Sequence, residues 1–347
     1  MLRDRDAPVT IEGIILRVYG YDHPPGCYIC DVEYAPELIY RSQVPKAQRN
    51  GKVRYYKFYE DEGLKFVLTK YPQYTIYSPI LNTRIVAIRE DQAMEIRRPH
   101  NGLLRLLNRG DAMSKASLEL LDLILSCSKL NLSSFGVFGS LLHDFYRIDL
   151  SDLDLTIYGM SELKELRETL KDLYGSCSLL NEFDVIKESN ISRWRFRGYA
   201  VKEYIWHQRR KEVYGILQSV NLGRKVKFEF EPVLEWSEIS NEYEHLLEVH
   251  NLGFVEAIVR ITDDRYAPYM PSKYGIEVLD LLKAPVKAEP IRIVSYVEEF
   301  RMQLFKDEVG FVAGWLEEVQ TSKGSFQQIV LTRRERYYDQ VLKLKDI

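Results

Sequence analysis

The sequence has few cysteines, few histidines and no long apolar run. Four cysteines in 347 residues are too few for a disulfide framework, and the six histidines are scattered. No apolar segment approaches the roughly 18–20 residues of a membrane-spanning helix. The charged N-terminus is unlike a secretory signal, and a net charge of -3 gives no global sign of nucleic-acid binding. We therefore expect a cytoplasmic protein without a membrane partner.

Cys27 and Cys30 have the spacing of a zinc knuckle. No second pair of cysteines or histidines follows at a suitable interval, and both residues lie in an apolar run typical of a strand. We therefore interpret the cysteines as structural residues.

The distribution of short β-like runs and helical periodicity predicts an α+β fold with three regions. Residues 1–99 and 251–347 contain short alternating runs broken by proline and glycine, which predict β-rich domains. Residues 100–250 mix strands with leucines at three- and four-residue steps, which predict helices. One of these helices is expected to begin with Ser161 as N-cap and to end near Tyr174.

One segment of the middle region combines a turn with an acidic strand. Gly139 and Ser140 follow an apolar run, and after eleven intervening residues Asp152 and Asp154 stand one residue apart between leucines. Because alternate side chains of a strand share a face, the two aspartates point the same way. Carboxylates about 6–7 Å apart on one face repel each other. The pattern therefore predicts a bound cation between them.

These residue types suit chemistry at a nucleotide phosphate. Gly139 lets the backbone turn tightly, and Ser140 offers a hydroxyl and an N–H at a helix N-terminus, where phosphate is favoured. Asp152 and Asp154 can hold Mg²⁺, which prefers carboxylate and phosphate oxygens. A second metal ion about 3.5–4 Å away would support the attacking and leaving oxygens. The pattern predicts in-line displacement at phosphorus.

The Gly-Ser pair and the spaced aspartates resemble the signature of the DNA polymerase β-like nucleotidyltransferase superfamily. In that signature a hydrophobic residue, here Phe138, precedes Gly-Ser, and two acids flank a hydrophobic residue after a spacer of similar length. The resemblance implies a central nucleotidyltransferase-type mixed sheet with helices, flanked by the β-rich segments. It also implies Mg²⁺ or Mn²⁺ as the cofactor and a nucleoside triphosphate as the substrate.

The resemblance further implies a third carboxylate from a neighbouring strand. In residues 226–233, Phe228 and Phe230 would face the core, so that Glu229 and Glu231 point the other way. Glu229 fits the superfamily pattern best because it stands between aromatics; Glu231 is the runner-up, and Glu203 is a more distant candidate. An ordinary half-exposed strand with solvated glutamates is the alternative interpretation.

The whole chain resembles a largely archaeal group of predicted nucleotidyltransferases. The matching segments are KYPQY at 70–74, HQRRK at 207–211 and TDDRYAPYMPSKY at 262–274. The group implies a small, glycine-containing turn between the Gly-Ser pair and the aspartates. This chain departs from it there, because residues 143–149 contain no glycine.

Two basic elements are further candidates for binding phosphates. His207 and Lys211 would share a helix face, with Arg210 beside them, and we expect this element to bind the triphosphate as pyrophosphate forms. Residues 193–197 (RWRFR) would align three arginines on one side of a strand, which suits a nucleic-acid backbone. A solvated charged face is the alternative for both elements.

The sequence therefore predicts a Mg²⁺-dependent nucleotidyltransferase. It would transfer a nucleoside monophosphate from a triphosphate, ATP in the first instance, to an acceptor hydroxyl and release pyrophosphate. RNA is the acceptor that the accessory segments favour, although a protein side chain and a small molecule stay open. The alternative is a catalytically inactive protein of the same fold that binds nucleotide or RNA.

Overall fold

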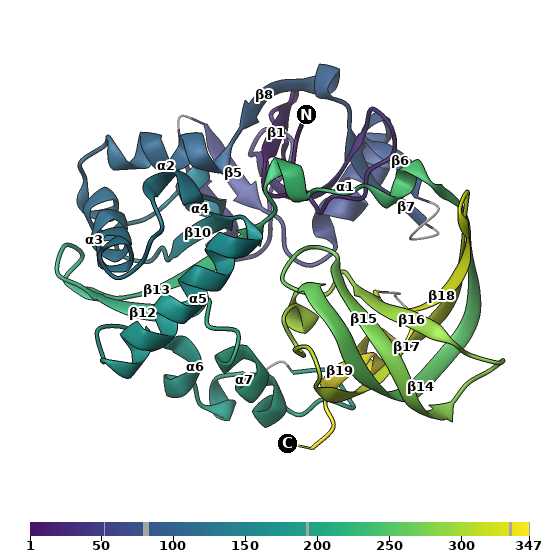
Figure 1. Ribbon diagram of the computed structural model, residues 1–347. Coiled ribbons are helices and arrows are strands. Elements are labelled where there is room, and N and C mark those ends of the chain that lie inside the picture. The colour runs from purple at the N-terminus through teal and green to yellow at the C-terminus, as the bar shows by residue number, and fades with distance from the viewer. Residues whose placement is uncertain (52, 79–82, 192–193, 333–334, 347) are drawn as a thin grey trace. The chain divides into compact units, whose positions relative to one another are not determined.

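The computed structural model describes residues 1–51, 53–78, 83–191, 194–332 and 335–346, which form two compact units (Figure 1). Unit 1 contains residues 1–78, 83–180 and 213–241; unit 2 contains the described parts of 181–212 and 242–346. The predicted mixture of α and β structure is confirmed. The units divide the chain differently from the predicted boundaries near 99 and 250. The N-terminal β-rich segment shares unit 1 with most of the middle region.

The N-terminal sheet of unit 1 has the strand order β4-β5-β3-β2-β1-β8, and β7 pairs with β3 and β6. Its strands and helix are β1 (Ala7–Thr10), β2 (Ile15–Val18), β3 (Tyr28–Pro36), β4 (Gln48–Asn50), β5 (Arg54–Lys57), α1 (Glu62–Lys70), β6 (Thr75–Ser78), β7 (Thr83–Ile88) and β8 (Ala93–Arg97). Alternating apolar residues such as Ile14, Leu16 and Val18 are buried in its core.

The second sheet of unit 1 carries the acidic strand. Its order is β11-β12-β13-β10-β9, from β9 (Phe135–Val137), β10 (Leu153–Tyr158), β11 (Leu180–Asn181), β12 (Tyr214–Ser219) and β13 (Arg224–Val233). β10 runs parallel to β13 and antiparallel to β9. The alternation in β10 fits this position, because Leu153, Leu155 and Ile157 are fully buried on one face.

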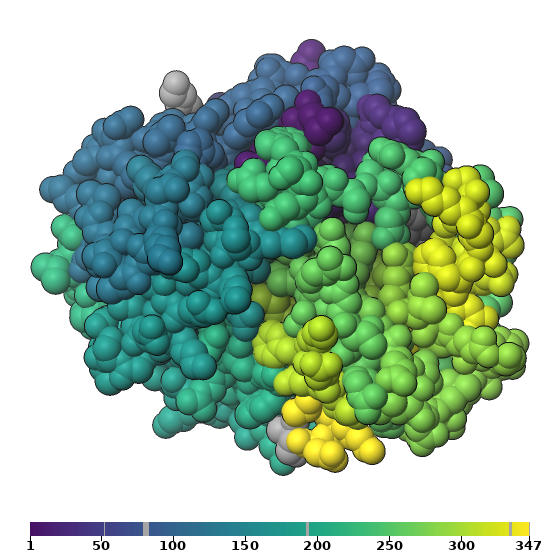
Figure 2. Space-filling view, in the orientation of Figure 1, coloured from purple at the N-terminus to yellow at the C-terminus, as the bar shows by residue number. Residues whose placement is uncertain are grey.

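Helices pack around this sheet. They are α2 (Pro99–Leu107), α3 (Ala112–Ser126), α4 (Gly139–Leu142) and α5 (Met160–Gly175). Leucines three and four residues apart, among them Leu163, Leu166 and Leu170, form the buried side of α5. In the space-filling view, the blue and teal side chains of these helices cover much of the sheet behind them (Figure 2).

The start of α5 differs from the prediction. The N-cap is Gly159, whose φ of 99° lets the chain turn directly out of β10, and Ser161 already lies within the helix. The Ser161 hydroxyl donates to Glu162 rather than capping a backbone N–H. The prediction was wrong because β10 ends directly before α5. The residue at the turn must therefore adopt a positive φ, which glycine does readily and serine does not.

Unit 2 is built around strands that close on themselves. The order is β14-β15-β16-β18-β17-β19, β14 also pairs with β17, and β16 runs parallel to β18. The elements of unit 2 are α6 (Glu182–Val185), α7 (Val201–Arg209), β14 (Leu246–Tyr266), β15 (Ser272–Lys283), β16 (Pro290–Ser295), β17 (Val309–Thr321), β18 (Gly324–Leu331) and β19 (Val341–Leu344). Apolar residues of these strands, with Phe196 and Tyr199, form its core.

None of the helices in the described ranges is long and apolar enough to cross a membrane.

Gly139 offers a direct test of how tightly the turn before α4 is packed. Its φ is +55°, and a Cβ there would lie 2.8 Å from Oδ2 of Asp154. Gly110 has a similar φ of +69° with nothing within 4 Å of its Cβ position. We expect Gly110→Ala to lower the free energy of unfolding by about 1 kcal/mol from backbone strain alone, and Gly139→Ala by about 1 kcal/mol more.

Urea denaturation of the two variants measures this difference. Equal losses for Gly110→Ala and Gly139→Ala would show that the Asp154 carboxylate can move away without cost.

Candidate active site

The acidic residues gather on the face of the second sheet opposite the leucines. Asp154 lies on β10 directly beside Glu229 on the parallel strand β13, and Thr156 lies beside Glu231. Residues paired in this way on neighbouring strands project to the same side. Asp152 immediately precedes β10 with the same alternation as Asp154, and its negative charge acts on Asp154. The face therefore collects carboxylates, as the spacing predicted.

The environment of Asp154 opposes its negative charge. Burial, and then the negative charge of Asp152, raise the pKa of Asp154 from 3.8 to about 7, and Glu33 and Glu231 add to this. The Lys57 ammonium group acts in the opposite direction. A cation bound between Asp152 and Asp154 would relieve the repulsion between them.

The Gly-Ser turn lies against the acidic strand. The backbone N–H of Phe138 donates to the Asp154 carbonyl oxygen at 3.1 Å, and Gly139 approaches the Asp154 carboxylate so closely that any side chain would collide with it. Ser140 follows in the first turn of α4, half-buried. Because α4 has only four residues, its dipole is small, and Ser140 would act through its hydroxyl and backbone N–H.

The two candidates for the third carboxylate have different surroundings. Glu231 is buried, and its Oε2 accepts a hydrogen bond of 2.7 Å from the guanidinium of Arg5, which is itself 1% exposed. This ion pair commits Glu231 to holding the N-terminal segment against β13. Glu229 is half-buried and lies next to Asp154. Glu229 is therefore the better candidate for completing the acidic site.

The N-terminal sheet contributes side chains that the sequence patterns did not identify. Lys57, at the end of β5, is opposite Tyr34 on β3, and its positive charge acts on both Asp154 and Glu33. Burial favours a higher pKa for the Glu33 carboxyl, but the hydrogen bond from His143 and the charge of Arg17 outweigh it and lower the pKa. Nothing in the local sequence around Lys57 or Glu33 signals this position, because both are far from Asp154 along the chain.

The loop between α4 and β10 is held by other elements rather than by a glycine turn. His143 is buried, with Nε2 3.2 Å from Oε2 of Glu33 and Nδ1 3.2 Å from a guanidinium nitrogen of Arg97. Asp144 adopts a φ of 57° and pairs with Arg109 at 2.9 Å. These contacts account for the departure from the expected glycine-containing turn: side-chain bonds fix the loop instead.

Two carboxylates on one face are a partial donor set for Mg²⁺. No group of three or more His, Cys, Asp or Glu side chains in the described ranges is close enough to form a metal site on its own. Mg²⁺, however, is commonly bound by one or two carboxylates together with phosphate oxygens and waters. Asp152 and Asp154 supply that pair of carboxylates, and the Asp152 charge, after burial, helps to raise the pKa of Asp154.

The predicted triphosphate-binding element has a different setting within unit 2. His207 is fully buried between the carbonyl oxygen of Gln303 and the N–H of Leu344, and burial lowers its pKa to about 3. Lys211 is also fully buried and donates to the carbonyl oxygen of Glu299 at 2.9 Å. Both side chains are therefore bound inside unit 2 rather than presented on an open helix face.

Arg210 lies beside this pair with its charge balanced. Its guanidinium bonds to Glu308 and stacks on the rings of Trp206 and Phe305 at 4.7 and 4.5 Å. Arg210 pairs within unit 2 because an acidic residue of the strand region is close enough to satisfy its charge. These contacts hold the Arg210 guanidinium within unit 2, which differs from the exposed triphosphate-binding group that the sequence predicted.

The other basic and acidic candidates of residues 193–203 also have partners in unit 2. Arg195 donates to the Tyr338 hydroxyl, and Arg197 pairs with Asp339; Arg193 lies outside the described residues. The interleaved aromatic residues pack against the core of the unit. Glu203 accepts hydrogen bonds from the Ala200 N–H and from Lys343 at 2.6 and 2.9 Å, which gives it a structural role at the start of α7.

All four cysteines have free thiols. Burial raises the pKa of both Cys27 and Cys30, and the Cys30 sulfur lies 3.4 Å from the Tyr28 carbonyl oxygen. These surroundings disfavour the thiolate form that binds zinc.

Comparisons with protein families, curated proteins and solved structures find no match for this chain.

The cost of ionising Asp154 predicts a gain in stability when it is removed. With a folded-state pKa of about 7 against 3.8, the folded protein retains a proton between these values that the unfolded chain has lost, so stability falls as the pH rises from about 4 to 7. In EDTA at pH 8 we expect Asp154→Asn to raise the free energy of unfolding by roughly 2 kcal/mol, and at pH 4 to change it little.

Thermal and urea unfolding at both pH values measure this effect. Asp122→Asn, an exposed aspartate of α3, is the matched control and should leave stability unchanged at either pH. An Asp154→Asn variant no more stable than the wild type at pH 8 would mean that the carboxylate is better compensated than its surroundings indicate.

Proposed function

We propose that unit 1 is a Mg²⁺-dependent nucleotidyltransferase that transfers a nucleoside monophosphate from a nucleoside triphosphate, ATP in the first instance, to an acceptor hydroxyl. The observation that carries this proposal is the contact between the Gly139 turn and the Asp154 carboxylate, on a sheet face that Asp152 and Glu229 share. The turn that we propose to bind phosphate therefore lies beside a carboxylate pair whose mutual repulsion a cation would relieve.

Asp152 and Asp154 would hold the metal, and Glu229 is the third acidic ligand that we assign. The bound metal would supply positive charge at the reacting phosphate and at the leaving pyrophosphate. Gly139 lets the triphosphate approach the backbone closely, and the Ser140 hydroxyl and N–H would donate to its oxygens. Lys57 would add a positive charge to the same space from the N-terminal sheet.

The reaction itself is an exchange of one P–O bond for another. The acceptor oxygen bonds to the α-phosphorus as the bond to the β-phosphate oxygen breaks, and pyrophosphate leaves with the electron pair of that bond. The proton of the acceptor hydroxyl would pass to the Glu229 carboxylate, which lies beside Asp154. RNA is the acceptor we favour.

A second candidate function is nucleotide or RNA binding without chemistry. One observation favours it: among the described residues, no group of three or more His, Cys, Asp or Glu side chains is arranged to hold a metal ion.

We expect labelled nucleotide to be transferred when the protein is incubated with α-labelled triphosphates, Mg²⁺ and cellular RNA or a small-molecule extract. Asp152→Asn and Asp154→Asn should each lower the rate by about a hundred-fold or more, because each removes a charge that the metal needs. Asp122→Asn is the control with unchanged rate. If no triphosphate gives either transfer or exchange with pyrophosphate, the binding function is the better explanation.

Substitution of the two glutamates separates their roles. Glu231→Gln leaves the buried Arg5 without its nearest counterion and should lower the free energy of unfolding by about 3 kcal/mol. Glu229→Gln should leave stability within about 1 kcal/mol and lower the transfer rate. Urea unfolding and the transfer assay measure the two effects. A stable but inactive Glu231→Gln variant, with an active Glu229→Gln variant, would reverse the assignment.

A further inference from the structure

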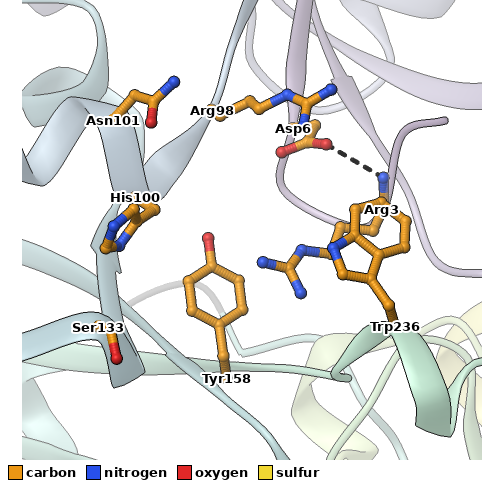
Figure 3. Close-up of a pocket in the computed structure, with 8 residues that line it drawn as sticks. All are labelled: Arg3, Asp6, Arg98, His100, Asn101, Ser133, Tyr158 and Trp236. Atoms are coloured by element: carbon orange, nitrogen blue, oxygen red, sulfur yellow. Dashed lines mark hydrogen bonds between the residues drawn. The ribbon is translucent and has the colours of Figure 1, made fainter. Parts of the chain in front are cut away.

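A cavity of about 240 Å³ lies in unit 1, at the end of β10 remote from Asp152. Figure 3 shows Arg98, His100 and Asn101, from the start of α2, and Tyr158, the last residue of β10, around a common space. The side chains of Arg3 and Trp236 also line the cavity. Polar and aromatic groups from distant parts of the chain therefore converge on one pocket.

This cavity is separate from the acidic face. Tyr158 is four residues beyond Asp154 on β10, which corresponds to roughly 13 Å along a strand. Between them, Thr156 is fully buried and the Arg5–Glu231 ion pair closes the face of the sheet. A ligand in the cavity would not occupy the space next to Asp154.

Two arginines line the cavity, and they differ in how firmly they are held. The Arg3 guanidinium stacks on the Tyr158 ring at 4.0 Å and on the Trp236 ring at 4.8 Å, and it donates to the Leu234 carbonyl oxygen at 3.3 Å. It is therefore fixed in place. Arg98 is exposed, and within the described residues no hydrogen bond or ion pair engages its guanidinium. This side chain is available to a ligand.

The start of α2 adds donors on the same side. Arg98 is the N-cap residue, its side chain makes no capping bond, and Pro99 occupies the first turn. The backbone N–H groups of His100 and Asn101 therefore stand at the positive end of a nine-residue helix. The Asn101 side chain is exposed beside them.

One acidic residue faces these donors. Asp6 is buried, accepts a hydrogen bond of 3.2 Å from the Arg3 backbone N–H, and has a pKa raised to about 6 by burial. Glu235 is a further carboxylate near the cavity, already paired with Arg3 at 3.3 Å, and the charge of Arg98 also acts on Glu90. The charges of Arg3 and Glu235 offset each other, and Arg98 and the helix end offset Asp6.

We propose that this cavity binds a phosphate ester of about nucleotide size, at a site separate from the acidic face. The phosphate would bind to Arg98 and the N–H groups at the start of α2, where charge-assisted hydrogen bonds are strongest. The Trp236 side chain is 40% exposed and offers an apolar surface for a ring of the ligand. The proposal does not depend on nucleotidyl transfer.

Calorimetric titration with inorganic phosphate, AMP and a short single-stranded RNA tests the site. The protein carries Asp152→Asn and is kept in EDTA, so that the acidic face does not contribute. We expect AMP to bind, and Arg98→Ala to weaken its binding by about ten-fold or more. Arg84→Ala removes an exposed arginine elsewhere in unit 1 and should change the affinity by less than about two-fold.

A second variant separates binding from folding. Asn101→Asp puts a negative charge at the start of α2, which favours the helix but repels phosphate, so it should abolish binding without loss of stability. Binding of AMP supports the proposal, whereas binding of RNA without AMP would contradict a site of nucleotide size. The proposal is overturned if none of the probes binds, or if Arg98→Ala and Asn101→Asp bind as tightly as the parent.

Discussion

The organisation of unit 1 depends on burying negative charge at the boundary between two sheets. Glu231 is buried and Asp154 is half-buried on the same face, and carboxylates in such positions are costly unless positive groups compensate them. The N-terminal region supplies those groups, with Arg5 on Glu231 and Lys57 near Asp154. The β-rich segment therefore contributes charged side chains to the acidic face.

Local patterns were sufficient to identify the strands that carry the acids. The alternation of leucine and aspartate in β10 and of phenylalanine and glutamate in β13 has the two-residue period of a sheet with one buried face, and the structure places those elements accordingly. The Gly-Ser turn could also be predicted from the sequence, because Gly139 adopts a positive φ that residues other than glycine rarely tolerate. Such features depend on neighbours in the sequence.

The residues that surround the acids could not be read in the same way. Lys57 and Glu33 reach the site through strand pairings between distant segments, and no spacing rule records such a pairing. The basic element at residues 207–211 differs from its predicted setting for a related reason. Its charge pattern suggests an exposed helix face, but Gln303, Leu344 and Glu299 bury His207 and Lys211. Burial by a remote partner cannot be inferred from charge alone.

The Arg5–Glu231 pair joins positions 226 residues apart, with the segment 181–212 of unit 2 inserted between them. A chain that leaves the ribosome from its N-terminus carries Arg5 without its Glu231 partner until almost two thirds of the sequence has been made. Contacts of such long range slow folding because a large loop must close first. Unit 1 can therefore be completed only late in biosynthesis. The N-terminal sheet is synthesised first, and it must remain without its contacts to β13 until residue 231 has been made.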